Sequence, residues 1–111
     1  MIILSNAFSY NMISVFPCAQ IAQELSLEEF AKELKKGGWK SSIGHADMAN
    51  MLTEMTGVAI EMNRCNDSLS VGDTLLIAQY SGPRLPEGAT ALPEGAKIKY
   101  LKVTICDVKG V

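Results

Sequence analysis

Several residue types are scarce in this chain of 111 residues, and each shortage excludes a class of protein. The three cysteines, Cys18, Cys65 and Cys106, are widely spaced and form no CxxC pair, so neither a disulfide framework nor a zinc site is predicted. No apolar run approaches the roughly 20 residues that cross a bilayer, and the first residues lack the basic start and long apolar region of a signal peptide. We therefore expect a cytoplasmic protein that has no membrane partner.

Basic residues are also few, with 10 lysines and arginines against 12 acidic residues and a net charge of −2. This balance argues against binding to an extended nucleic-acid duplex, because such proteins normally neutralise many phosphates. The only two arginines, Arg64 and Arg84, lie in predicted loops. The planar fork of arginine suits phosphate better than the point charge of lysine, so a local phosphate contact stays open. No Walker loop or dinucleotide fingerprint occurs.

The apolar residues that are present suffice for one hydrophobic core. They make up nearly half of the chain, so we expect a single domain over residues 1–111. One helix is predicted to begin at Ser26, because Ser26 and Glu29 have the spacing of a capping box, and to end at a glycine pair. A second helix is predicted to begin after His45 and to end at Gly57.

Strands are predicted where apolar residues cluster or alternate, at residues 2–4, 19–25, 58–62, 74–79 and 97–108. In the last strand, alternation predicts a buried set of Ile98, Leu101, Val103, Ile105 and Val108. Glycine and proline exclude regular structure just after the fourth strand, where Leu-Pro-Glu-Gly-Ala occurs at 85–89 and again at 92–96. This order of elements indicates a small α/β domain with a mixed β-sheet flanked by helices.

His45 is the only histidine, and it ends the polar turn 41–45 just before the second predicted helix. Histidine is the side chain whose unperturbed pKa, about 6.5, allows proton transfer near neutral pH. The first N–H groups of a helix are unpaired and carry partial positive charge, which makes an anion site. A proton donor beside an anion site predicts phosphate chemistry, although a lone histidine is more often a loop or capping residue.

Three loop residues, His45, Arg64 and Arg84, could be gathered at one edge of a sheet. Together they suit RNA cleavage by the 2′-hydroxyl of the substrate, which attacks the neighbouring phosphorus and expels the 5′-oxygen. His45 would protonate the leaving oxygen, and the arginines would stabilise the added negative charge. DNA lacks this hydroxyl and would not be a substrate. Asp47 alone near His45 is poor evidence for a metal site, so no metal or cofactor is predicted.

Four ordered blocks of residues are similar to the small viral and prophage-borne ring nucleases that act as type III anti-CRISPR proteins. The similarity runs over nearly the whole chain, and four blocks in order are more specific than any one of them. The blocks are Asn6-Ala7-Phe8-Ser9 with Asn11-Met12, Ser42-Ile43-Gly44-His45, Asn63-Arg64, and Gln79 with Arg84-Leu85 and Glu87-Gly88.

The resemblance implies a homodimer that binds cyclic tetra-adenylate, the second messenger of type III CRISPR immunity, and opens the ring without a metal ion. The products would be linear di-adenylates that end in a 2′,3′-cyclic phosphate. The resemblance also implies that His45 is the general acid, that Arg64 stabilises the scissile phosphate, and that Glu87 completes the catalytic set from a closing loop. The residues expected to hold the ring are Ser9, Asn11, Ser42, Gly44, Asn63, Gln79 and Arg84.

A second class of function stays open, namely a dimeric module that sequesters a cyclic nucleotide or contacts nucleic acid as a regulator without cleaving it. A turnover assay separates the two, because a binder forms no products. A third alternative, a structural subunit with a solvated His45, predicts no ligand-induced shift of the melting temperature.

Overall fold

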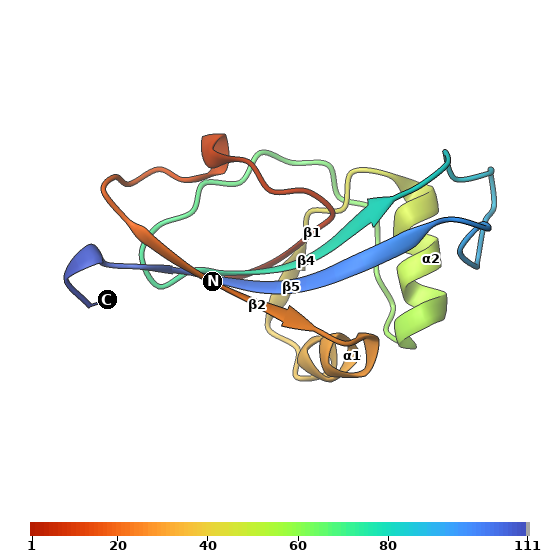
Figure 1. The fold of residues 1–111 in the computed structure, drawn as a ribbon, viewed down its shortest axis with the longest axis horizontal. Helices are drawn as coiled ribbons and strands as arrows, with labels where there is room; N and C mark the ends of the chain where they lie inside the picture. The colour runs from red at the N-terminus through yellow and green to blue at the C-terminus, as the bar shows by residue number, and fades with distance from the viewer. Residues whose placement is uncertain (111) are drawn as a thin grey trace.

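A computed structural model describes residues 1–110, which form two α-helices, two short 3-10 segments and a five-stranded sheet (Figure 1). The helices are α1 (Leu27–Lys35) and α2 (Ala46–Thr56), and the 3-10 segments are Tyr10–Met12 and Val108–Gly110. The strands are β1 (Ile2–Ser5), β2 (Ala19–Leu25), β3 (Trp39–Ser41), β4 (Thr74–Ser81) and β5 (Lys97–Cys106).

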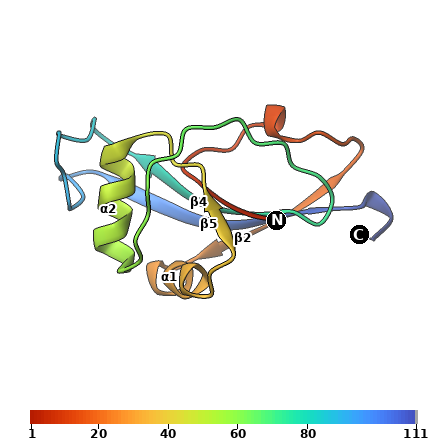
Figure 2. The ribbon, with the colours of Figure 1, turned by 180° about the vertical axis from the view of Figure 1, so that it is seen from behind.

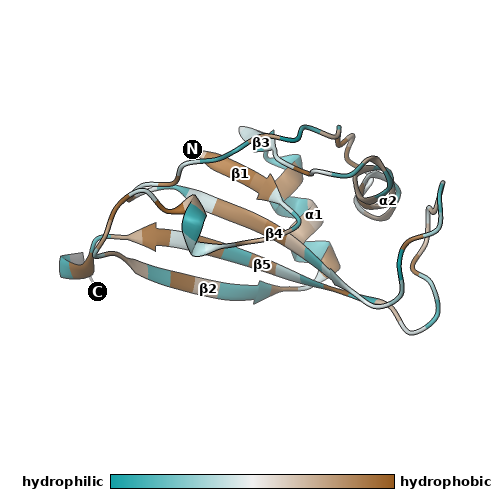
Figure 3. Cartoon of the chain, turned by 90° about the horizontal axis from the view of Figure 1, so that it is seen from above, coloured by the Kyte–Doolittle hydropathy of each residue, from teal (hydrophilic) through white to brown (hydrophobic). Residues whose placement is uncertain are grey.

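The sheet is mixed, with the strand order β2-β5-β4-β1-β3. β1 pairs in parallel with both β3 and β4, whereas β5 runs antiparallel to β4 and to β2. Figure 3 shows β1, β4, β5 and β2 side by side, with α1 behind them. The predicted small α/β domain with a mixed sheet flanked by helices is therefore confirmed. The expected homodimer stays a prediction.

Alternate residues of the central strands face two hydrophobic clusters, one on each side of the sheet. On the helix side, buried residues of the sheet pack with α1 and α2, among them Leu4, Phe30, Leu34, Met48, Leu52, Leu76 and Tyr100. The other cluster includes Ile3, Ile13, Leu69, Leu75, Ile77, Val103 and Ile105. Figures 1 and 2 both place α1 on one side of the sheet, and the first 3-10 segment and the later part of the connection between α2 and β4 on the other.

Local signals explain both helices. The Ser26 side chain accepts a hydrogen bond from the Glu29 N–H, and the Glu29 carboxylate accepts one from the Ser26 N–H, so the predicted capping box is present. α2 begins at the N-cap His45 and ends at Gly57, whose φ of 74° is a left-handed conformation that glycine adopts at low cost. Both predicted helices are confirmed.

The strand predicted at residues 58–62 is wrong. The Ile60 N–H donates to Thr53 Oγ1, and the Val58 N–H donates to Thr56 Oγ1. Two threonines of α2 thus take backbone hydrogen bonds that a sheet partner would otherwise make. Conversely, the short edge strand β3 was not predicted.

The last predicted strand is correct up to Cys106, and its buried set holds for Val103 and Ile105. The prediction that Val108 is buried is wrong, because Val108 lies in the 3-10 segment after β5 and is 45% exposed. The alternation that made Val108 a core candidate stops where the ladder with β2 ends, at the pair Ala19 and Cys106.

Candidate functional site

The candidate site forms where three parallel strands end. Asn6 follows β1, Ser42 follows β3, and Gly82 follows β4. Because β1 is parallel to both β3 and β4, these residues lie at the same edge of the sheet. Ligands of open α/β sheets commonly bind beyond this carboxyl edge.

The turn from Ser41 to His45 is fixed by backbone contacts. The Ser42 N–H donates to the carbonyl of Leu4 at 2.7 Å. Asn63 holds the turn from the other side, because its side-chain amide donates to the Ser41 carbonyl at 2.8 Å and its N–H donates to the Ile43 carbonyl at 2.9 Å. Asn63, predicted to hold a ligand, thus supports the turn that carries His45.

Arg64 is tied to the peptide group just before the histidine. Its Nε and Nη2 both donate to the Gly44 carbonyl, at 3.3 Å and 3.0 Å. The remaining N–H groups of the guanidinium are left for another acceptor. His45 follows this peptide as an exposed N-cap, and its side chain makes no capping hydrogen bond. The arrangement therefore fixes the backbone and leaves the imidazole available to a ligand.

A cavity of about 410 Å³, which we call the β1–β3 cavity, lies beside this turn. It brings together five of the predicted site residues, namely Asn11, Ser42, Gly44, His45 and Arg64. The other residues that line it are Ser5, Asn6, Ala7, Met12, Cys65, Asn66 and Asp67.

A second cavity of about 380 Å³, the loop cavity, also includes His45 and Asn6. The predicted Arg84 also lines it and comes from the 82–96 loop, which Figure 1 shows between β4 and β5. The remaining lining residues are Asp47, Met48, Tyr80 and Leu85. His45 is thus shared by two cavities that hold one arginine each.

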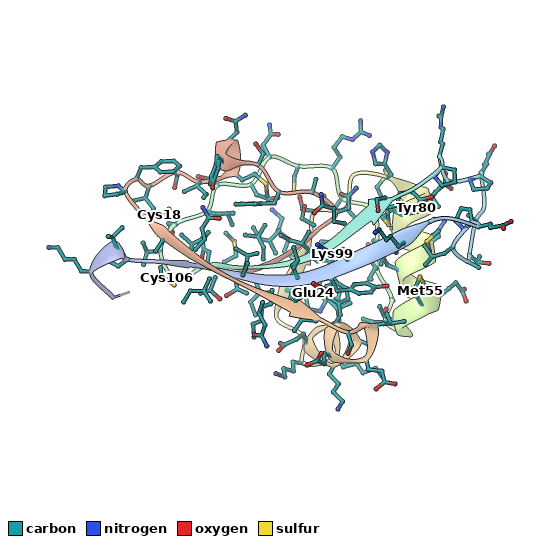
Figure 4. The ribbon with its side chains drawn as sticks, viewed as in Figure 1. Cys18, Glu24, Met55, Tyr80, Lys99 and Cys106 are labelled. Carbon is teal, nitrogen blue, oxygen red and sulfur yellow. The ribbon has the colours of Figure 1, made fainter. Side chains whose placement is uncertain are left out.

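Two contacts attach the 82–96 loop to the body of the protein. The Tyr80 hydroxyl, which Figure 4 labels near the end of β4, donates to the carbonyl of Pro83. The Gly88 N–H lies 3.4 Å from the Asp47 carboxylate, in the first turn of α2. These contacts position Arg84 between two anchored points.

Four predicted site residues line neither cavity: Asn63, which supports the turn described above, and Gln79, Ser9 and Glu87. Gln79 lines a third cavity of about 430 Å³, together with Glu24 and Lys99, which Figure 4 labels on neighbouring strands. Ser9 is exposed and accepts a hydrogen bond from the Asn11 N–H. Glu87 is exposed in the turn of the 82–96 loop.

Sequence reasoning did not select Asn6, Asp47 or Asp67 as site residues. Asn6 had a signal, because it directly follows a predicted strand, as ligand-contacting residues of parallel sheets often do. No sequence signal pointed to Asp67. Its side chain is only 3% exposed, but it lies in an irregular connection whose sequence has no pattern that predicts burial. Its nearest cation is Lys40, whose Nζ lies 3.7 Å from Asp67 Oδ1.

Two features are absent from the described part of the chain. Within residues 1–110, no three His, Cys, Asp or Glu side chains are grouped so that they could hold a metal ion. Neither α-helix of that range is long and apolar enough to cross a membrane.

Comparison with known proteins places the chain in a family. The family model described as STIV B116-like matches residues 2–102, which is most of the sequence. The chain belongs to the STIV B116-like family. The chain is also similar to the solved structure of B116 of Sulfolobus turreted icosahedral virus, with a TM-score of 0.82 and 30% sequence identity. The match covers 93% of this chain and 97% of B116.

A curated relative also comes from a Sulfolobus virus. Uncharacterized protein 26 of Sulfolobus islandicus filamentous virus (isolate Iceland/Hveragerdi) is 42% identical over 55 residues, which is 50% of this chain. The match spans 47% of that relative, so the chain covers about half of its length. Both similar proteins are therefore viral.

Proposed function

We propose that this protein is a ring nuclease that binds cyclic tetra-adenylate as a homodimer and cleaves it without a metal ion, which would suppress type III CRISPR immunity. The observation that carries the proposal is the position of His45. One proton donor is shared by two cavities, with Arg64 in the first and Arg84 in the second. Membership of a viral family agrees with such a role.

The proposed reaction needs only this chain, its substrate and water. The 2′-oxygen of a ribose bonds to the adjacent phosphorus while the bond from phosphorus to the 5′-oxygen breaks. The proton of the 2′-hydroxyl passes to water, and protonated His45 donates its proton to the leaving 5′-oxygen. The free N–H groups of Arg64 stabilise the charge that develops on the phosphoryl oxygens. The products carry a 2′,3′-cyclic phosphate and a 5′-hydroxyl.

Symmetry would supply the charge that one chain lacks. A cyclic tetra-adenylate carries four phosphates, whereas each chain has a net charge of −2 and only Arg64 and Arg84 as arginines. Two subunits related by a two-fold axis would place four arginines around one ring. The symmetric ring would then be cut at two equivalent positions, which yields two di-adenylates.

The test is incubation of the protein with cyclic tetra-adenylate in the presence of a chelator, followed by separation of the products. Conversion to di-adenylate with a cyclic phosphate is the expected result. His45→Ala should lose rate by orders of magnitude and keep binding. Lys36→Ala, at the end of helix α1 and outside both cavities, should cleave like the unaltered protein.

An intact ring after long incubation would contradict the proposal of catalysis. Binding measured on the same samples would then separate a sequestering module, which retains affinity for the ring, from a protein of another function.

A further inference from the structure

A buried carboxylate, that of Asp67, lines the β1–β3 cavity, where a phosphate ligand would be expected to meet only positive charge. Asp67 accepts a hydrogen bond from the Ser42 hydroxyl at 2.5 Å through Oδ2. Its Oδ1 lies 3.6 Å from the thiol of Cys65 and 3.7 Å from Nζ of Lys40. Ser42, Cys65 and Asp67 all line the cavity. This carboxylate therefore dictates how its polar neighbours are oriented.

The orientation matters most for Ser42. A hydroxyl group has one proton to donate and two lone pairs that accept. An ionised carboxylate can only accept hydrogen bonds, so in the contact with Asp67 the Ser42 hydroxyl is the donor and its one proton is used there. Cys65 Sγ lies 3.5 Å from Ser42 Oγ and engages at most one lone pair, which leaves the other lone pair of this cavity-lining residue for a ligand. Ser42 then presents an acceptor to a ligand.

An acceptor at this position does not suit a phosphate oxygen, which itself only accepts and is negatively charged. It suits a ligand group that carries a hydrogen. The cavity also contains His45 and Arg64, the residues proposed to act at the scissile phosphate. In an oligoribonucleotide, the hydroxyl beside each phosphate is the ribose 2′-hydroxyl.

We infer that Ser42 Oγ accepts a hydrogen bond from a ribose 2′-hydroxyl of the bound ring, and that Asp67 is the positioning residue that holds Ser42 in the accepting orientation. The inference rests on the proposed function and adds to it a determinant of specificity for ribose. Ser42 contacts the ligand, whereas Asp67 acts through Ser42. Lys40 offsets the charge of the buried carboxylate.

The experiment compares the affinities of two rings for His45→Ala protein, which leaves the ribose ring uncut. The probes are cyclic tetra-adenylate and its 2′-fluoro analogue, in which fluorine keeps the size of the substituent but donates no hydrogen bond. The measured quantity is the ratio of the two Kd values. A loss of one neutral hydrogen bond corresponds to roughly a threefold to tenfold change.

Ser42→Ala and Asp67→Asn, each added to His45→Ala, should both lower the preference for the ribose ring by about threefold or more. In Asp67→Asn, the amide can donate to Ser42 and turn its proton toward the cavity. Ser42→Thr keeps the hydroxyl and should restore the preference. The matched control is Ser14→Ala, because the Ser14 hydroxyl donates to the Leu69 carbonyl and lines neither cavity, so its loss should leave the ratio unchanged.

Equal weakening of both rings by Ser42→Ala, with an unaltered ratio, would overturn the inference and leave the proposed function intact. If Asp67→Asn fails to fold, the Ser42→Ala and Ser42→Thr pair still decides the matter. If the parent protein binds neither ring, the proposed function itself is overturned, and the inference fails with it.

Discussion

Gly82 begins the 82–96 loop and lies against Ala96 at its other end. It follows β4 with a φ of 141°, a backbone conformation that side chains rarely adopt. A Cβ placed on Gly82 would lie 2.7 Å from Cα and 2.8 Å from Cβ of Ala96, on the opposite side of the loop neck. Gly82→Ala therefore cannot be accommodated unless the neck opens.

The cost follows from two terms. A strained backbone conformation costs on the order of 1–3 kcal/mol, and a forced close contact typically adds about 1–3 kcal/mol where the surroundings cannot move. The neck joins an exposed loop, so we expect displacement of the loop to relieve most of the contact. The melting temperature should fall by roughly 4–8 °C, as about 1–2 kcal/mol does in a domain of this size. Displacement of Arg84 should lower the rate of ring cleavage by up to about 100-fold.

The assay pairs thermal melting with single-turnover cleavage. Gly95→Ala is the matched control, because Gly95 lies in the same loop with a φ of 80°, but a Cβ added there would meet no atom within 4 Å. Adding Ala96→Gly to Gly82→Ala should restore part of the rate, since the contact with the Ala96 Cα remains. The reasoning is refuted if Gly82→Ala and Gly95→Ala have the same melting temperature and the same rate.

Two further predictions concern the charged groups. Arg64→Lys keeps the charge but loses the pair of hydrogen bonds from Nε and Nη2 to the Gly44 carbonyl, so single-turnover cleavage should slow by about tenfold or more. Equal rates would contradict the role of this pair of hydrogen bonds. The hydrogen bond from Lys102 lowers the pKa of Glu33 in the folded protein. The Glu33 carboxylate therefore stabilises the fold at pH values above its unfolded pKa, about 4.3. This stabilisation is lost as the pH falls through the lowered pKa of the folded state. Glu33→Gln should therefore lose stability at pH 7 but little at pH 3, measured as urea midpoints, and equal losses at both values would refute the linkage.

Both helices were predicted correctly because neighbouring residues fix one end of each. The capping box at Ser26 and the left-handed Gly57 are local signals, and they mark the start of α1 and the end of α2. The segment 58–62 has the composition of a strand, but the threonines of α2 lie close enough to take its hydrogen bonds. That competition depends on the folded position of a helix, so the sequence pattern alone could not reveal it.

The site residues likewise divide into those whose grouping the sequence predicted and one that only the folded strand could place. His45 and Arg64 were predicted from their places in loops, and one cavity contains both. Gln79 was selected beside Arg84, yet successive residues of a strand point to opposite faces. Tyr80 lines the loop cavity, and Gln79 lines the third cavity with Lys99. A single step along β4 separates them, and no pattern in the sequence says which residue faces His45.

The two helix starts differ in a way that bears on function. Ser26 completes a capping box at α1, whereas His45 holds the N-cap of α2 with no side-chain hydrogen bond. A serine at an N-cap typically contributes about 1 kcal/mol more than a residue that cannot cap. The chain thus forgoes stability where the proposed general acid stands, a local conflict that is typical of functional sites.

The conflict gives a direct test. His45→Ser has an oxygen that can accept from the N–H of Met48, as Ser26 accepts from Glu29 in α1. His45→Ser should therefore melt about 4 °C above His45→Ala. Both variants should lack ring cleavage. A serine variant that is no more stable than the alanine variant would show that position 45 does not limit the stability of α2. A serine variant that still cleaves the ring would remove His45 from the chemistry.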